Sequence, residues 1–401
     1  MEYESPLNLI IDRATFKIVD KKNLTQNLKN TKLRVKFGID PTGKNIHLGR
    51  ASTIQRLRDF QELGHRIVLI IGDFTATVGD SSDKKEFRKN LSREAVNENF
   101  KTYKNQLSKI LDLSKVEFRY NSEWLDKLEF STLIALSKKF TVAQMIEREN
   151  FHYRYDNKIP IGLHEFLYPL MQGYDSVAIK SDVELGGSDQ LFNLLSGREV
   201  QEFFGMKKQD IVTKKLLIGT DGRKMSTSWG NVINIMDTPN DIYGKVMSIR
   251  DTEIIEYFTL TTRISDKVIK EINNDLKKSS KSGIMNIKKT LAFEITSMYS
   301  SKKDALKAEE YFKQRIQNKD YDKLDDIIEV KVKSDNVDIL TLISNLTGQM
   351  PSRAEAKRLI LSGAVLVDKK KVLDYKEIIN IKDKMMVKVG KKSIVRIKKD
   401  E

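Results

Sequence analysis

The chain has 401 residues, of which 39% are hydrophobic and 32% charged, and its formal net charge is +15. This length exceeds what one ordinary core needs, so we expect two or three domains. Cysteine is absent, which excludes disulfides and thiolate metal sites, and four histidines leave little for a zinc centre, so we expect no resident metal.

A membrane or export role is not expected either. The longest apolar run, residues 67–71, is far shorter than the roughly 20 residues that span a bilayer. The first residues are acidic and lack the apolar core of a signal peptide, so we expect a cytoplasmic protein.

Residues 33–235 alternate between short apolar runs and stretches of helical pattern. The runs that are typical of buried strands are residues 33–39, 67–71, 116–118 and 212–217. Alternating strands and helices predict an α/β fold, a Rossmann-like doubly wound and mostly parallel sheet. We assign this first domain to residues 1–235.

The first of the helical patterns starts directly after a strand. Apolar side chains recur at near-helical spacing at Leu48, Ala51, Ile54, Leu57 and Phe60, and Gly64 is placed to end the helix. The helix therefore begins at His47-Leu48-Gly49. Such a strand-to-helix turn presents backbone N–H groups and the positive end of the helix dipole to a phosphate.

Beyond residue 235 the pattern becomes mainly helical, with few Gly or Pro, and we assign a helical domain to residues 236–329. The polar residues 330–336 are the expected linker. Residues 337–401 form a small α/β domain in which Ser352 and Glu355 make a capping box and Gly363 ends a helix. Short strands are expected there at residues 365–367, 385–389 and 394–397.

This last domain carries much of the excess charge. Residues 337–401 hold 15 Lys and Arg against 8 Asp and Glu, a net charge of +7 in about one sixth of the chain. Affinity for a phosphate backbone comes largely from released counterions, so this concentration predicts a nucleic-acid partner. The candidate contacts are Arg353, Lys357 and Arg358.

Three short motifs follow one another in a fixed order along the chain. They are Asp40-Pro41-Thr42 with His47-Leu48-Gly49-Arg50, then Gly186-Gly187-Ser188-Asp189-Gln190, then Lys224-Met225-Ser226-Thr227-Ser228. Each motif alone is a weak signal. Their combination predicts a site for a nucleoside triphosphate.

The residue types in these motifs suit that chemistry. Thr42 and His47 can donate hydrogen bonds to a departing pyrophosphate, and Gly49 leaves room for an adenine ring against the helix. Asp189 can accept from ribose hydroxyls. A lysine on a loop between glycines, Lys224, can bind phosphates while the transition state forms and then release the product.

A further segment indicates the kind of substrate. Tyr168, Gln172 and Asp175 lie at i, i+4 and i+7, which puts them on one helical face. A hydroxyl, an amide and a carboxylate in one stripe can surround an ammonium and a phenol. Pro169 would kink this helix unless it lies near the first turn.

With these residues in place, the chain resembles the class I aminoacyl-tRNA synthetases, and more closely the bacterial tyrosyl-tRNA synthetases, from about residue 30 to the C-terminus. Further segments that carry the resemblance are Gly72-Asp73-Phe74-Thr75, Gly79-Asp80, Asn121-Ser122-Glu123-Trp124 and His164-Glu165-Phe166-Leu167-Tyr168. The last domain resembles a small basic RNA-binding domain shared with a ribosomal protein.

The resemblance implies an enzyme that activates L-tyrosine with ATP to tyrosyl-adenylate and transfers tyrosine to the 3′ end of tRNA(Tyr). ATP with Mg²⁺ is then a substrate, and no tightly bound cofactor is implied. A homodimer is also implied, through an insertion near residues 125–150. No segment remains for an editing domain.

The resemblance also implies a role for each motif residue. Pyrophosphate would be stabilised by Thr42, His47 and Lys224. ATP would be held by Asp40, His47, Gly49, Arg50, Gly187, Asp189, Lys224, Ser226 and Thr227. Tyrosine would be held by Asp80, Tyr168 and Gln172 around the ammonium, by Asp175 at the phenolic hydroxyl and by Gln190 near the carboxylate.

Three positions depart from the family pattern. Arg50 stands where the first motif usually ends in His, and Thr227 replaces a second Lys, for which Arg223 or Lys224 would have to compensate. Lys36 stands where many relatives have a second tyrosine, which leaves more of the hydroxyl recognition to Asp175.

Three alternatives stay open at this point. A tryptophanyl enzyme shares the fold and motifs, but the basic last domain and Asp175 argue against it. An RNA-binding protein that has lost activation is kept open by Arg50 and Thr227. A small-molecule nucleotidyltransferase has no use for an RNA-binding tail and ranks last.

Overall fold

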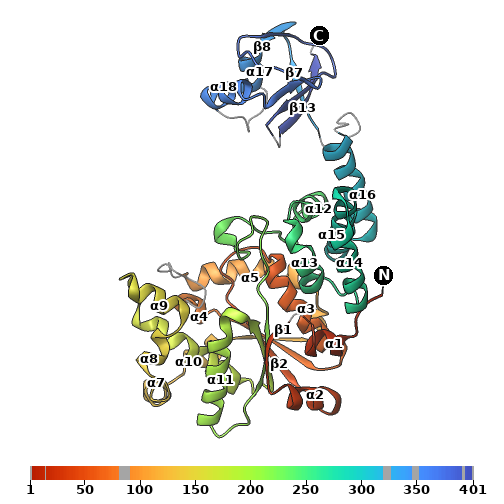
Figure 1. Ribbon diagram of the computed structural model, residues 1–401. Helices are drawn as coiled ribbons and strands as arrows, with labels where there is room; N and C mark the ends of the chain where they lie inside the picture. The colour runs from red at the N-terminus through yellow and green to blue at the C-terminus, as the bar shows by residue number, and fades with distance from the viewer. Residues whose placement is uncertain are drawn as a thin grey trace. The chain divides into compact units, whose positions relative to one another are not determined.

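The computed structural model describes residues 2–13, 15–80, 91–318, 327–345, 352–390 and 393–399. The chain forms two compact units, Met1–Glu309 and Glu310–Glu401 (Figure 1). No helix in the described parts is long and apolar enough to cross a membrane.

A six-stranded sheet lies at the centre of the first unit. Its strands are β1 (Thr15–Val19), β2 (Arg34–Ile39), β3 (Arg66–Ile71), β4 (Val116–Tyr120), β5 (Val183–Gly187) and β6 (Asp210–Lys214). The order is β1-β6-β5-β2-β3-β4, with β1 antiparallel to β6 and every other pair parallel. The expected mostly parallel α/β fold is therefore confirmed.

The strand order fixes where a ligand can bind. From β2 the chain proceeds to β3 on one side, whereas β5 and β6 lie on the other side of β2. Right-handed crossovers in opposite directions put the connecting helices on opposite faces of the sheet. The crevice at the carboxyl ends of β2 and β5 is the topological switch point, where open α/β sheets bind ligands.

Helices and short 3₁₀ turns connect the strands. The helices are α1 (Pro6–Ile11), α2 (Lys21–Asn30), α3 (Leu48–Glu62), α4 (Thr75–Val78), α5 (Arg93–Leu107), α6 (Ser122–Leu125), α7 (Phe130–Ser137), α8 (Val142–Ile146), α9 (Glu149–Asp156), α10 (Leu163–Ala178) and α11 (Leu191–Phe203). The 3₁₀ turns are η1 (Leu113–Lys115), η2 (Ser188–Gln190), η3 (Thr227–Trp229) and η4 (Asp251–Glu253).

Helix α3 runs as the spacing predicts, from its N-cap His47 to the segment before Gly64, which has a φ of +87°. The helix is apolar on the predicted stripe but also buries polar side chains, among them Arg56 and Asp59. Helix α10 contains Pro169 in its interior and still continues to Ala178. The helix therefore continues beyond this proline.

The helical part of the first unit is formed by α12 (Pro239–Met247), α13 (Ile254–Thr261), α14 (Asp266–Lys278), α15 (Lys281–Tyr299) and most of α16 (Lys302–Phe312). The end of α16 and the π-helical turn that follows it, η5 (Lys313–Asn318), belong to the second unit. Helices α12, α13 and α14 all pack against α15 (Figure 1).

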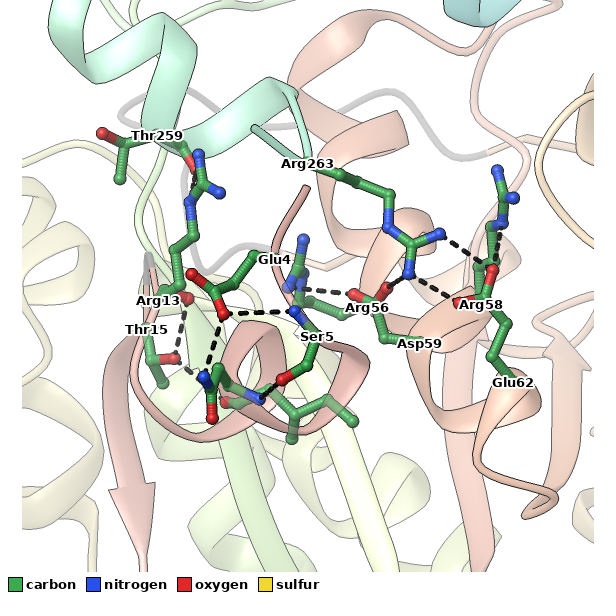
Figure 2. Close-up of polar contacts among 12 residues, drawn as sticks. Glu4, Ser5, Arg13, Thr15, Arg56, Arg58, Asp59, Glu62, Thr259 and Arg263 are labelled. Atoms are coloured by element: carbon green, nitrogen blue, oxygen red, sulfur yellow. Dashed lines mark hydrogen bonds and ion pairs between the residues drawn. The ribbon is translucent and has the colours of Figure 1, made fainter. Parts of the chain in front are cut away.

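Buried ion pairs join α3 to the segment after α13. Arg263 contacts Asp59 with Nη2 at 3.0 Å from Oδ1, and Asp59 Oδ2 lies 2.9 Å from Arg56 Nη1 (Figure 2). Arg263 also contacts Glu62 at 2.6 Å. Arg13 donates to backbone carbonyls of the helical part, at Thr259 and Phe258. The helix that begins at His47 is therefore held by the helical part along its far end.

In the described residues of the second unit, a five-stranded and a two-stranded sheet accompany the helices α17 and α18. Its elements are β7 (Ile328–Val332), β8 (Asn336–Asp338), α17 (Ile339–Asn345), α18 (Arg353–Leu361), β9 (Val365–Val367), β10 (Lys370–Lys371), β11 (Ile378–Asn380), β12 (Met386–Val389) and β13 (Ser393–Lys399). The larger sheet has the order β10-β9-β12-β13-β7. Ser352 caps α18 by accepting from the Glu355 N–H, and Gly363 ends it with a φ of +68°.

The expected linker at residues 330–336 is wrong. Residues of β7 pair in parallel with β13, so this segment belongs to the sheet of the second unit. Its alternating Lys side chains made this segment resemble a solvent-exposed linker. They instead alternate with half-buried apolar side chains, Val330 and Val332, that pack on the core of this unit.

Candidate active site

A cavity of about 250 Å³ opens where β2 and β5 end. All of the candidate residues in the first unit line it: Asp40, Thr42, His47, Gly49, Arg50, Asp80, Tyr168, Gln172, Asp175, Gly187, Asp189, Gln190, Lys224, Ser226 and Thr227. The structure thus brings three distant motifs and the α10 stripe to one place. Within the described residues, no group of three or more His, Asp or Glu is arranged to hold a metal ion.

His47 is the N-cap of α3 and lies nearly buried at the cavity. Its Nδ1 accepts the Arg50 backbone N–H at 3.4 Å. Burial, together with the charges of Arg50 and Lys224, lowers the pKa of His47 to about 3. The imidazole is therefore neutral, with its proton on Nε2, and can donate one hydrogen bond without carrying a charge.

Glycine is required next to this imidazole. A Cβ at Gly49 would lie 3.1 Å from His47 Nδ1 and 3.2 Å from its Cε1. Both distances are tighter than ordinary packing. A side chain at this position would therefore displace the imidazole, in addition to occupying the surface where an adenine ring is expected.

The last motif contacts the first one directly. Met225 is buried, and its sulfur accepts the Gly49 backbone N–H at 3.4 Å. The following stretch is tied to the start of α3, because the Leu48 N–H donates to the Ile233 carbonyl at 2.8 Å. The loop that carries Lys224 is thus attached to the helix that carries His47.

Lys224 contacts the diglycine motif. Its Nζ lies 2.8 Å from Asp189 Oδ2. A Cβ at Gly187 would collide with the Asp189 carboxylate, so the glycine allows that side chain to turn toward the cavity. The candidate phosphate and ribose contacts therefore meet across the cavity.

Asp40 is held by two hydroxyl donors. Tyr168 Oη donates to its Oδ2 at 2.8 Å, and Thr75 Oγ1 donates to its Oδ1 at 2.9 Å. A Cβ at Gly72 would collide with this carboxylate. Burial and the neighbouring Asp40 raise the pKa of Tyr168 well above its usual value, so its hydroxyl stays protonated and remains a donor.

A chain of polar contacts surrounds the expected ammonium position. Gln190 and Asn193 each reach the Asp80 carboxylate at 3.4 Å. Asn193 also donates to Gln172 Oε1 at 3.2 Å, and Gln172 donates to Glu184 Oε1 at 2.9 Å. Each side chain in this wall is therefore fixed by its neighbour.

Lys36 supports this wall from behind. It is fully buried, and its Nζ lies 2.9 Å from Glu184 Oε1 and 2.7 Å from the Gln172 carbonyl oxygen. Ser176 accepts a third bond from it at 2.8 Å. Lys36 thus holds Glu184 and Gln172, and it is not among the residues that line the cavity.

Asp175 is fully buried at the end of the cavity. Trp124 donates its indole N–H to Oδ1 at 2.8 Å. Burial raises the pKa of Asp175 to about 7, although Lys36 and the Trp124 hydrogen bond act in the opposite direction. A buried carboxylate of this kind suits an acceptor for one hydroxyl donor on a ligand.

Arg50, which departs from the family pattern, and Arg223, a candidate to compensate for the missing lysine, lie in different surroundings. Arg50 lines the cavity, and its Nη1 donates to Tyr103 Oη at 2.7 Å. Arg223 lies over the Trp229 ring and pairs with Asp221, and it is not among the lining residues. Arg50 and Lys224 thus line the cavity, whereas Arg223 does not.

The remaining candidates lie in the second unit. Arg353 and Arg358 are exposed on α18, and the Lys357 ammonium lies 4.0 Å from the centre of the Tyr375 ring. The unit packs its own core around α17 and α18. Arg353 and Arg358 are thus accessible to solvent on this helix, whereas Lys357 is half-buried against Tyr375.

Sequence reasoning gave no role to several residues that build the site. These are Thr75, Asn121, Trp124, Glu184 and Asn193. Asn121 donates to Thr75 Oγ1 at 2.9 Å and hydrogen-bonds Asp175. The segments that contain Thr75, Asn121 and Trp124 belong to the stretches that carried the family resemblance, which is the signal that pointed to them.

The sequence matches a known family over most of its length. Residues 28–317 match the family model of class I tRNA synthetases (W and Y), and residues 348–384 match the S4 domain. A tyrosine–tRNA ligase of Thermotoga maritima is 44% identical over 390 residues, which cover 97% of this chain and 96% of the relative. Tyrosine–tRNA ligase 2 of Clostridium acetobutylicum is 44% identical over 396 residues, with 97% of each chain covered.

Solved structures share the fold. A C-terminally truncated mitochondrial tyrosyl-tRNA synthetase of Aspergillus nidulans superimposes with a TM-score of 0.64 at 18% identity, covering 78% of this chain and 94% of that chain. The tyrosyl-tRNA synthetase of Archaeoglobus fulgidus, complexed with L-tyrosine, gives a TM-score of 0.59 at 23% identity, covering 76% and 98%.

Proposed function

The chain belongs to the class I tRNA synthetases for tryptophan and tyrosine, and within them to the tyrosine–tRNA ligases; from this premise we propose that the cavity between β2 and β5 is where tyrosine is activated by ATP. The observation that carries the proposal is the gathering of all the nucleotide and tyrosine candidates around that one cavity. Two substrates that must react with each other need a shared site.

The tyrosine end of the cavity is assigned to α10 and its neighbours. Asp175 accepts a hydrogen bond from the phenolic hydroxyl, with Trp124 fixing the carboxylate. Tyr168, Gln172 and Asp80 surround the ammonium, and Gln190 lies beside the carboxylate of the amino acid. The buried polar wall behind Gln172 supports this assignment, because fixed dipoles position a substrate without reorganising.

The nucleotide end is assigned to the start of α3, to the diglycine motif and to the loop around Lys224. The ribose is held by Asp189, and Gly187 allows its approach. Asp40, Gly49, Arg50, Ser226 and Thr227 complete the ATP site. Mg²⁺ enters with ATP as part of the substrate.

In the first step the tyrosine carboxylate attacks the α-phosphate of Mg-ATP, the bond to the β-phosphate breaks, and pyrophosphate leaves. The carboxylate is already ionised, so no general base is needed. Thr42, neutral His47 and Lys224 stabilise the charge that grows on the pyrophosphate, by position and electrostatics and without a covalent intermediate.

In the second step a hydroxyl of the 3′-terminal ribose of tRNA(Tyr) attacks the tyrosyl carbonyl, and AMP leaves. The second unit binds the tRNA, and Arg353, Lys357 and Arg358 on α18 contact its phosphates. The match of residues 348–384 to the S4 domain supports this role. We place the enzyme in the cytoplasm, where tRNA is charged for protein synthesis.

The active form is a homodimer that associates through the region of α7 and α8. Phe130 on α7, Val142 on α8 and Leu163 at the start of α10 are large apolar side chains that are between 64% and 78% exposed. Exposed apolar side chains of this size would be covered in a protein–protein interface. Sedimentation at micromolar concentration should give twice the mass of the 46.2 kDa chain, and a monomer under those conditions would refute the dimer.

The deciding experiment is ATP–pyrophosphate exchange with purified protein and Mg²⁺, run separately with tyrosine, tryptophan and phenylalanine. Exchange with tyrosine alone is expected. Exchange with tryptophan would place Asp175 outside the recognition of the side chain. No exchange in a folded protein would mean that Arg50 and Thr227 mark a lost activity and would favour an RNA-binding role.

A further inference from the structure

Trp229 is an exposed tryptophan at the rim of the cavity. Its residue is 51% exposed, at the end of the η3 turn that starts at Thr227. Thr227 and Ser228 line the cavity, whereas Trp229 is not among the lining residues. The indole therefore lies just outside the space that tyrosine and ATP occupy.

Arg223 and Trp229 form a stacked pair. The guanidinium carbon of Arg223 lies 4.1 Å from the centre of the indole ring. Nε and Nη2 of the same arginine donate to Asp221 Oδ2 at 2.7 Å and 2.5 Å. The guanidinium is thus held over the ring, and both groups remain about half exposed.

One buried side chain fixes this pair to the catalytic loop. Asn231 donates to Asp221 Oδ1 at 2.7 Å, and its Oδ1 accepts the Ser226 N–H at 2.8 Å. It also donates to the Lys224 carbonyl at 3.0 Å. The stacked pair and the phosphate-binding Lys224 are therefore parts of one preorganised loop, and they are presented together.

We propose that Trp229 and Arg223 are a docking point for the single-stranded 3′ end of tRNA, with a base stacked on the indole and a phosphate beside the guanidinium. The inference rests on the proposed function, because the second step requires the 3′-terminal ribose to enter this cavity. An aromatic face next to a cation is what sequence-independent binding of a single strand uses. The same side chains are outside the space for the small substrates.

The chemistry of the pair also argues against two simpler roles. A residue that only closed the hydrophobic core would be buried, and Trp229 is not. A residue that stacked on the adenine of ATP would line the cavity, and Trp229 does not. Stacking on a base that remains outside the cavity accounts for both observations.

The test compares the two half-reactions in one variant. Trp229→Ala should leave ATP–pyrophosphate exchange with tyrosine within about twofold and should raise the KM for tRNA in charging by about tenfold or more, since stacking contributes on the order of 1–3 kcal/mol per base. Trp229→Phe should recover most of the loss. Phe16→Ala, which removes an aromatic of similar exposure on the edge strand β1, is the matched control.

A binding measurement separates the 3′ end from the rest of the tRNA. The wild-type protein should bind intact tRNA(Tyr) more tightly than tRNA trimmed of its single-stranded 3′ nucleotides, and Trp229→Ala should lose that difference. Unchanged charging in the alanine variant would overturn the proposal. A parallel loss of exchange and charging would show instead that Trp229 supports the loop or ATP, and absence of exchange in the wild type would refute the proposed function itself.

Discussion

The proposed role of His47 is that of a neutral hydrogen-bond donor. Burial keeps the pKa of the imidazole near 3, so the group does not titrate between pH 5 and 9. In the proposed mechanism its Nε2 donates a hydrogen bond to the departing pyrophosphate, and this donor is available at any working pH. A proton shuttle would instead require a pKa near the working pH.

Replacing His47 should therefore lower the rate of exchange without changing its pH dependence. His47→Ala should reduce kcat by about 10²-fold, which is the size of effect seen when one transition-state donor is removed, with a smaller change in the KM for ATP. Steady-state exchange between pH 6 and 9 measures both. If the pH profile of the wild-type rate shows an ionisation that is absent from the variant, His47 works as an acid or base.

The burial of Asp175 makes the stability of the folded protein depend on pH. Its pKa in the folded protein is about 7, above the ordinary value of 3.8, because burial penalises the carboxylate. The folded protein therefore holds this proton more tightly than the unfolded chain. The resulting stability is fully present below about pH 4 and is lost as the pH rises to 7.

Asp175→Asn should remove this pH-dependent loss of stability. The free energy of unfolding of the variant, relative to the wild type, should increase by about 3 kcal/mol between pH 5 and pH 8. Urea unfolding at the two pH values, followed by tryptophan fluorescence, measures the difference. A constant difference across this range would mean that Asp175 is ionised throughout and that its burial is compensated.

Individual residues of the candidate site could be predicted from the sequence where they belong to a recognisable motif. Gly187 and Lys224 could be assigned to a cavity because glycine and a loop lysine at those spacings suit phosphate chemistry. Lys36 and Glu184 could not, since a buried ion pair between two strands has no spacing in the sequence. Their partnership depends on parallel strands β2 and β5 being neighbours.

At the scale of elements, α3 connects the catalytic cavity to the helical part. His47 caps one end, and near the other end Asp59 is fully buried between Arg56 and Arg263. Removing Asp59 would leave the buried Arg56 without its counter-charge, whereas Arg263 would still contact Glu62. A surface pair on the same helix offers the contrast, because Arg58 and Glu62 are partly exposed.

Asp59→Asn should thus destabilise the first unit by about 3–5 kcal/mol, because the buried Arg56 loses its counter-charge and Arg263 keeps only Glu62. Arg58→Ala, on the same helix, should cost about 1 kcal/mol or less. Thermal and urea unfolding of the two variants provide the comparison. Equal and small effects would mean that water or another group compensates the buried arginines.

Complete burial gave the clearest signal for a strand in the sequence. Residues 67–71 form an uninterrupted apolar run, and β3 is buried on both faces as a result. Strand β1 was not foreseen, because it lies at the edge of the sheet and none of its five side chains is fully buried. Strand β7 was mistaken for a linker for the same reason, since its pattern is mixed and its partner is the distant β13.

At the scale of the whole molecule, the two units divide the reaction between them. The cavity belongs wholly to Met1–Glu309, and the basic helix α18 belongs to Glu310–Glu401. The sequence placed the division at a linker near residue 330. The structure moves it to the end of α16, because β7 and the side chains around Tyr311 and Ile327 pack with the second unit.

Truncation after Glu309 should therefore keep tyrosine-dependent exchange within about twofold and abolish detectable charging of tRNA. Truncation after Asn336 should give a less soluble protein, since it leaves β7 without β13 and uncovers Ile327. Exchange, charging and yield of soluble protein are the three measurements. Loss of exchange in the shorter protein would mean that the second unit is needed for the fold of the first.

The central claim is that one cavity activates tyrosine and that Asp175 recognises its hydroxyl. The most direct measurement is kcat/KM of exchange for tyrosine and for phenylalanine, in the wild type and in Asp175→Ala. Leaving a buried acceptor without a partner costs about 1–3 kcal/mol, and more when it is charged, so the wild type should strongly prefer tyrosine. The variant should lose this preference while its KM for ATP stays nearly unchanged. An unaltered preference in Asp175→Ala would contradict the account.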